Sequence, residues 1–337
     1  MNSNEEWLLT NKEEALEPNL PICDPHHHLW DFNKTYIEET YLLPDILKDT
    51  ESGHNIVSTV FIECGAMYNP EHSIEEQVIN ETEFVNGIAA MSNSGLYGKT
   101  KIAEGIVGSA PLLFGDKVAN ILDKHISVAP KRFKGIRSQA AMHPDGTIPS
   151  TRARPIEGVY INDMFHQGFA HLEPRNLSFE AWCYHPQLPQ LIQLAKKFPN
   201  TSIILNHFGG PLGIGSFTDK EEETYSFWEK HITELSKCEN VVAKLGGIAM
   251  EINGFKWHLN KKAPSGLELI NRTKRYYEKT LDLFGIDRCM FESNFPVDKI
   301  SCSYVNLWNG FKLLTKDYSP DERTKLFHDN ATRIYKL

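Results

Sequence analysis

The chain has 337 residues and a formal net charge of −9, and 23% of its residues are charged. A chain of this length can form two modest domains or one large α/β barrel, and its acidic balance excludes the electrostatic footprint of a nucleic-acid-binding protein. No apolar stretch reaches the roughly 20 residues of a membrane-spanning helix, and the N-terminus lacks the basic start and apolar run of a signal peptide. The six cysteines include no C-x-x-C pair, which favours reduced thiols in a cytoplasmic protein.

Short apolar runs alternate with longer amphipathic segments from residue 21 onward, after an expected N-terminal extension over residues 1–20. The runs predict eight strands, at residues 20–28, 55–65, 101–110, 132–140, 177–185, 201–210, 240–247 and 287–295. The segments after them predict helices, at residues 71–91, 117–127, 160–172, 188–198, 224–236, 267–285, 304–314 and 319–337. A doubly wound open sheet usually carries a Gly-rich phosphate loop after its first strand, where this chain has PHHHLWD. The sequence therefore predicts a single (β/α)8 TIM barrel over residues 21–337, with long loops after several strands.

Polar side chains stand where several predicted strands end, on the face of a barrel that holds active sites. Because side chains two apart on a strand point the same way, each strand delivers an aligned set. The expected inward sets are Ile22, Asp24, His26 and His28 on the first strand, Ile203, Leu205 and His207 on the sixth, and Met290, Glu292 and Asn294 on the eighth. The second strand ends in Glu63-Cys64 and the fifth in Tyr184-His185.

One histidine at a strand end is usually a hydrogen-bonded rim residue, and that interpretation competes with a metal site here. The H-x-H pair of His26 and His28, joined by His207, favours a metal pocket, since neutral imidazole binds zinc and similar ions. His27 points the other way and is expected to be structural.

Four motifs give the chain a family resemblance from about Pro21 to Leu337. They are D-P-H-H-H-L-W-D, F-K-G-I-R, N-H-F-G-G-P and F-E-S-N-F-P-V-D-K, on the first, fourth, sixth and eighth strands. Together they resemble the amidohydrolase superfamily, and within it the amidohydrolase-related (amidohydrolase 2) branch, which includes lactonases. The resemblance implies a (β/α)8 barrel that hydrolyses an ester, lactone or amide with an activated water.

The resemblance also implies metal ligands, and one of them is missing. Carried over by motif, the ligands are His26, His28, His207 and, less firmly, His185. The aspartate that the resemblance implies on the eighth strand falls at Asn294, and an amide has no basic lone pair to accept a proton from water. The sixth-strand motif has Asn206 where relatives often have aspartate.

Two accounts of the site stay open. In the first, one divalent metal binds, with zinc the expected ion, and Asp298 or, behind it, Glu63 takes the proton. In the second, the site is metal-free and polar side chains polarise the substrate carbonyl.

The remaining candidates concern the substrate. Arg137 is expected to bind an anionic group, since its fork fits a carboxylate; a surface arginine that closes a salt bridge is the less favoured alternative. Arg152 and Arg154 either add to this anion pocket or are solvated loop charges. The expected pocket wall consists of Trp182, Tyr184 and Asn294; the alternative for the two aromatic residues is that they fill the barrel. Lys244, in an otherwise apolar strand, is expected to pair with Glu292 and with Asp24, because an unpaired buried charge costs several kcal/mol; a catalytic lysine is the less favoured alternative.

The leading hypothesis is a hydrolase that opens a small carboxylated lactone or cyclic ester. Its partner is a small-molecule substrate, with no nucleic acid or membrane, and a homo-oligomer is compatible with the sequence. One alternative is a metal-dependent decarboxylase on the same scaffold. Another is a non-catalytic barrel that binds a small molecule, which the amide at Asn294 would support.

Overall fold

The computed structural model describes residues 3–31, 40–151 and 155–337. Its main sheet has eight parallel strands in the order β1, β4, β5, β6, β7, β8, β9, β10. The strands are β1 Pro21–His27, β4 Asn55–Ile62, β5 Lys101–Ser109, β6 Phe133–Gln139, β7 Ser178–Trp182, β8 Ile203–Leu205, β9 Val241–Leu245 and β10 Cys289–Phe291. The first and last strands meet through a parallel bridge between His27 and Phe295, and the His28 amide donates to the Phe295 carbonyl at 2.8 Å. The sheet thus closes into the predicted barrel, in one domain.

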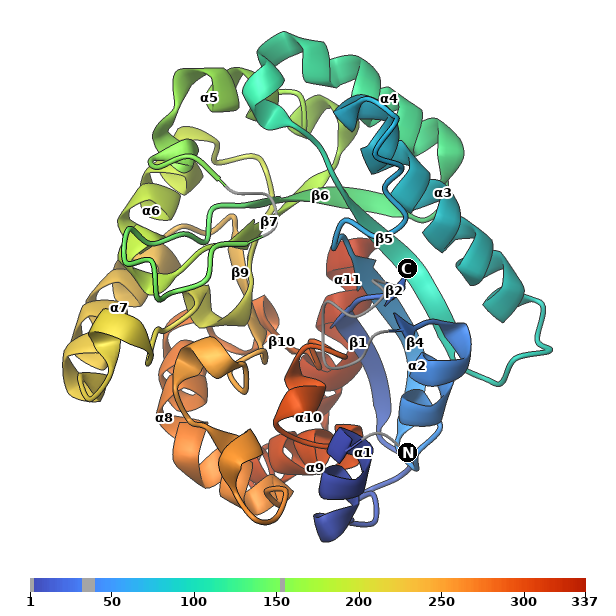
Figure 1. Ribbon diagram of the computed structural model, residues 1–337, viewed down its shortest axis with the longest axis vertical. Helices are drawn as coiled ribbons and strands as arrows, with labels where there is room; N and C mark the ends of the chain where they lie inside the picture. Colours follow the sequence, from blue (N-terminus) through green and yellow to red (C-terminus); the bar gives the residue numbers. More distant parts are fainter. Residues whose placement is uncertain (1–2, 32–39, 152–154) are drawn as a thin grey trace.

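Helices surround the strands, as Figure 1 shows. They are α1 Ser3–Leu8, α2 Leu43–Thr50, α3 Ile74–Asn93, α4 Val118–Val128, α5 Asp163–Phe169, α6 Leu188–Lys197, α7 Glu221–Ser236, α8 Gly266–Phe284, α9 Tyr304–Leu314, α10 Pro320–Thr324 and α11 Asn330–Tyr335, and a short hairpin of β2 Trp30–Asp31 and β3 Thr40–Tyr41 follows β1. Capping boxes begin the two longest helices, with Ser73 before α3 and Ser265 before α8. No helix in the described part of the chain is long and apolar enough to cross a membrane.

The core has an inner and an outer layer. The inner layer fills the barrel with apolar side chains from six strands, and α11 closes its floor; it comprises Cys23, Val60, Ile62, Val107, Ile204, Val242, Met290, Ala331 and Tyr335. The outer layer, between strands and helices, is much larger. These layers are those of a packed barrel without a pore, so the active site is expected at the rim formed by the carboxyl ends of the strands.

Two strands face differently from the predicted alternation. On β8, Ile204 faces the interior, while Ile203 and Leu205 pack against the helices. On β1, Cys23 faces inward and Ile22 outward, because the pairing with β4 shifts register after Ile22 and again after Asp24. Irregular pairing of this kind reverses side-chain direction locally.

Candidate active site

Three histidines meet at the carboxyl end of the barrel. The ring centroids of His26 and His28 are 5.0 Å apart, and those of His26 and His207 are 4.5 Å apart. His207 reaches the group because β8 ends at Leu205 and the chain then turns, with His207 at φ 52°. All three imidazoles are buried. The structure therefore brings together the residues that the sequence placed on one rim.

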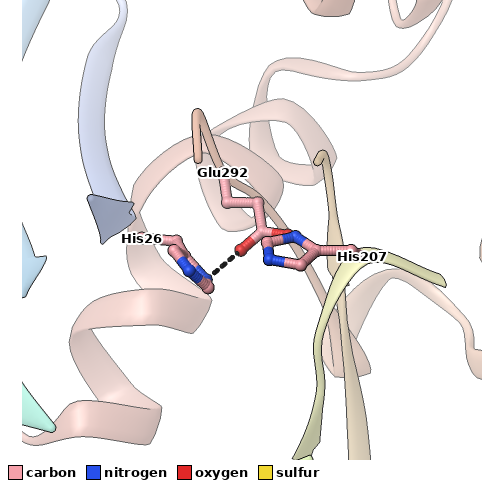
Figure 2. A group of neighbouring side chains, drawn as sticks. All are labelled: His26, His207 and Glu292. Carbon is pink, nitrogen blue, oxygen red and sulfur yellow. Dashed lines mark hydrogen bonds and ion pairs between the residues drawn. The ribbon is translucent and has the colours of Figure 1, made fainter. Parts of the chain in front are cut away.

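Glu292, the residue directly after β10, lies between two of these histidines and contacts both (Figure 2). Its Oε1 lies 2.7 Å from His207 Nδ1, and its Oε2 lies 2.8 Å from His26 Nδ1. Sequence reasoning placed Glu292 on the inward face but gave it only the role of an ion-pair partner. One feature of the sequence could have indicated this role: an acidic residue at an inward position of the last strand, which neighbours the first strand and its H-x-H pair.

Burial sets the protonation preferences of the cluster. It lowers the pKa values of His26, His28 and His207 well below their usual value, and the positive charge of Lys244 adds to the effect on His26 and His207. Burial also raises the pKa of Glu292 to about 8, although Lys244 acts in the opposite direction. The imidazoles are therefore held neutral, which is the form that binds metal ions.

Lys244 lies behind the cluster and is paired, as predicted, but mainly with a different acid. Its Nζ is 3.0 Å from Glu180 Oε2 and 4.0 Å from Glu292 Oε2, and it donates to the Pro25 carbonyl at 2.8 Å. The expected contact with Asp24 is wrong. Glu180 lies on β7, which is separated from β9 by β8, so a search among the strands adjacent to β9 would not find it.

Asp24 instead ties the first strand to the end of the last. It accepts hydrogen bonds from Ser293 N at 2.9 Å, Ser293 Oγ at 2.6 Å and the Tyr304 hydroxyl at 2.9 Å. Because Ser293 follows Glu292, these bonds fix the segment that carries the bridging carboxylate.

The donor set fits one divalent ion. Ligand atoms of His26, His207 and Glu292 all lie within 4.8 Å of one another. Glu292 Oε2 is buried, and no described residue gives it a hydrogen bond of good geometry, so it retains a lone pair for a cation. Two imidazoles and one glutamate are also a known catalytic zinc set, which leaves a further position for water or substrate.

Arg137 forms an ion pair with Glu63. Arg137 Nε donates to Glu63 Oε1 at 2.6 Å, and Nη2 donates to the Glu63 carbonyl. The third nitrogen, Nη1, lies 3.4 Å from His26 Nε2, and Gln139 Nε2 also donates to Glu63 Oε1 at 2.6 Å. The guanidinium therefore links Glu63 to His26, and the anion-binding role expected for Arg137 stays a prediction.

Glu63 also lines a cavity of about 940 Å³ at the ends of β4, β5 and β6. Its second carboxylate oxygen, Oε2, accepts no hydrogen bond from any described side chain or amide. Glu63 is thus the acid that connects the cavity, through Arg137, to the histidine cluster.

The structure does not bring Asp298 or Asn294 to this cluster. Asp298 Oδ1 accepts from Asn294 Nδ2 at 2.9 Å, and Oδ2 accepts from Ala249 N at 3.2 Å. Asn294 has a left-handed backbone with φ 55°, which turns its side chain toward Asp298. Both side chains therefore belong to a buried, hydrogen-bonded loop, and the roles expected for Asp298 in proton transfer and for Asn294 in the pocket wall stay predictions.

His185 is likewise outside the cluster. It starts a 3-10 turn, His185–Gln187, so its side chain no longer follows the alternation of β7. Its Nδ1 accepts from Leu212 N at 3.2 Å, and its ring packs edge-on against Phe217 at 4.9 Å. These contacts make His185 part of the loop packing.

The two aromatic candidates lie beside the site. The Trp182 ring contacts His207 with centroids 4.9 Å apart and Tyr184 with centroids 5.8 Å apart. The Tyr184 hydroxyl donates to the Pro149 carbonyl. Arg152 and Arg154 lie outside the described residues.

Comparison with known proteins identifies the family. The family model described as "Amidohydrolase" matches residues 23–337. An uncharacterized protein, y4mH, of Sinorhizobium fredii is 32% identical over 337 residues, which is 95% of this chain and 99% of that one. The chain therefore belongs to the amidohydrolase family, as its motifs suggested. An L-fucono-1,5-lactonase of Burkholderia multivorans is 26% identical over 179 residues, covering 51% of this chain and 56% of that protein.

Solved structures agree on the fold. An amidohydrolase from Burkholderia multivorans with bound HEPES superposes with a TM-score of 0.70 at 21% identity, over 94% of this chain and 99% of that one. A zinc-bound crystal form of an amidohydrolase from that organism gives a TM-score of 0.69, also at 21% identity, with the same coverage. A manganese complex of 5-carboxyvanillate decarboxylase from Novosphingobium aromaticivorans gives 0.57 at 13% identity, over 97% of this chain and 99% of that one. At these identities the likeness concerns the barrel alone.

Proposed function

We propose that the protein opens a lactone or cyclic ester with a water molecule activated at His26, His207 and Glu292. The observation that carries the proposal is the buried carboxylate bridging two neutral imidazoles at the catalytic end of the barrel. Its membership of the amidohydrolase family and the lactonase name of a partial relative support the same reaction class.

Each residue of the site has a definite role in the proposed reaction. His26, His207 and Glu292 would hold a divalent ion, with zinc favoured by the donor set, and such an ion would supply a Lewis acid and a more acidic water. Glu63 accepts the proton through its unbonded oxygen and returns it to the leaving oxygen of the ring. Arg137 and Gln139 hold Glu63 in one orientation through hydrogen bonds of 2.6 Å. Trp182 excludes water from the side of His207.

Decarboxylation is the less favoured alternative. In that reaction Arg137 was the residue expected to anchor the substrate's carboxylate, and here it is paired with Glu63. A purely binding barrel would gain nothing from a buried carboxylate between two imidazoles, since desolvating that charge costs free energy.

The test combines metal analysis with a substrate panel. Purified protein should contain about one divalent ion per chain by elemental analysis, and it should acidify unbuffered solutions of γ- and δ-lactones in a pH-indicator assay. Metal-depleted protein should lose that activity and regain it with Zn²⁺. If the metal-free protein were fully active, the metal-free mechanism would hold instead, in which Glu292 orients His207 as the general base. A metal-loaded protein that hydrolyses no lactone or ester would contradict the proposed function.

A further inference from the structure

The charges around the cavity indicate what kind of molecule it accepts. Among the described residues that line it, the charged side chains are Asp31 and Glu63, and both are acidic. No lysine, arginine or histidine belongs to that described lining. Against these described residues, a substrate carboxylate would meet the exposed Asp31 and the Glu63–Arg137 pair, and Asp31 repels it at close range.

Arg137, a buried cation paired with the lining residue Glu63, is not free to bind a substrate carboxylate. Two of its nitrogens donate to Glu63, and its third lies 3.4 Å from His26 Nε2. Releasing Arg137 to a substrate would leave Glu63 as an unpaired buried acid, and breaking such a pair is strongly destabilising. The pair therefore presents a nearly neutral surface to the cavity.

The rest of the lining is largely apolar. Met67 and Ile74 line this cavity, and they are 40% and 42% exposed, although large apolar side chains are usually more buried. Leu113 and Phe114, in the segment after β5, continue the apolar wall. Gln77 and Gln139 add neutral hydrogen-bonding groups. A cavity of about 940 Å³ lies at the upper end of the range of roughly 300–1,000 Å³ for ligand pockets.

We propose that the substrate is an uncharged lactone or cyclic ester that carries an apolar substituent. Its ring carbonyl lies toward Glu63 and Gln139, and its substituent lies against Ile74, Leu113 and Phe114. This inference rests on the proposed function for the reaction, and on the cavity's charges and apolar wall for the substrate class. It replaces the carboxylated substrate expected from the sequence, because that expectation required a free Arg137.

The experiment compares two δ-lactones that share one ring and a four-carbon side chain. The chain ends in a methyl group in one compound and in a carboxylate in the other. We expect kcat/KM to be at least tenfold higher for the methyl compound. In Ile74→Lys, which adds a cation to the cavity wall, the ratio should fall at least threefold. Leu96→Lys is the matched control, since Leu96 is 84% exposed and lies outside the cavity lining, and the ratio should not change.

Binding without turnover separates failure of this inference from failure of the proposed reaction. The corresponding pair of δ-lactams, which keep the ring and side chain but resist hydrolysis, is titrated by calorimetry. Tighter binding of the methyl lactam supports the inference even if no lactone is hydrolysed. Equal or tighter binding of the carboxylated lactam, or a higher kcat/KM for the carboxylated lactone, overturns it and leaves the hydrolytic reaction intact.

Discussion

Replacing Glu292 by glutamine is the sharpest test of the site. Glutamine keeps the size and shape of the side chain and removes only the negative charge. In the native protein, Glu292 Oε1 and Oε2 lie 2.7 and 2.8 Å from the Nδ1 atoms of His207 and His26. After the substitution, one of the two imidazoles would face an amide N–H₂ group, which cannot accept a hydrogen bond from it.

The expected loss follows from these two contacts. The substitution puts an uncharged amide in place of the one acidic ligand of the proposed centre, and because even groups that only orient metal ligands contribute about 10–100-fold to affinity, the loss in binding free energy should be on the order of 3 kcal/mol. At about 1.4 kcal/mol per tenfold change, the affinity for Zn²⁺ should fall about 100-fold or more in Glu292→Gln. Stability should be unchanged or higher, because burial already disfavours the charge of Glu292, as its raised pKa of about 8 indicates.

The assay is a competition between the protein and a chromophoric chelator for Zn²⁺, with thermal unfolding as the folding control. Asp298→Asn is the matched variant, since Asp298 is an equally buried carboxylate in the same segment, but its oxygens bond Asn294 and Ala249. We expect its Zn²⁺ affinity to remain within threefold of the native value. If Glu292→Gln binds Zn²⁺ as tightly as the native chain while folding normally, Glu292 does not hold the ion and the proposed centre is wrong.

Three further predictions concern neighbouring groups. Glu63→Gln should lower kcat on a responsive lactone at least 100-fold and leave Zn²⁺ affinity within a few fold, whereas Asp298→Asn should keep nearly full activity; the reverse pattern would restore Asp298 as the proton acceptor. Gly247→Ala should weaken Zn²⁺ binding at least tenfold without unfolding the chain, because its Cβ would lie 1.9 Å from His207 Nδ1; unchanged affinity would refute this clash. Burial raises the pKa of Asp298 to about 8, so its proton stabilises the fold below the unfolded value near 4, and this stability is lost as pH rises toward 8. Urea unfolding should show the decline, at most about 1.4 kcal/mol per pH unit for one group, and Asp298→Asn should flatten it.

The sequence predicted the barrel because its signals are local and repeated. Apolar runs at regular intervals, each followed by an amphipathic segment, specify strand and helix without knowledge of long-range contacts. The meeting of His26, His28 and His207 also followed, since closing the ring brings the ends of distant strands to one rim. These inferences needed the order of the strands and little else.

The failures share a physical cause, which is that strand geometry stops where the site begins. His185 starts a 3-10 turn, and Asn294 adopts φ 55°. Neither side chain therefore points as it would if the two-residue alternation of the strand continued to that position. His207 also has a positive φ of 52°, yet its turn carries the ring into the site. A left-handed residue at a strand end redirects its side chain, and sequence alone rarely reveals which non-glycine residue adopts it.

The position of the acid on the last strand has a similar explanation. At Asn294 a carboxylate would have been expected from the family resemblance, but that side chain turns toward Asp298 at 2.9 Å. Glu292 lies two residues earlier, next to β10, and its extra methylene relative to aspartate lets the carboxylate reach both His26 and His207. An amide at Asn294 therefore does not mean that the site lacks an acid. The centre depends on a carboxylate reaching the two imidazoles, and in this chain Glu292 provides it.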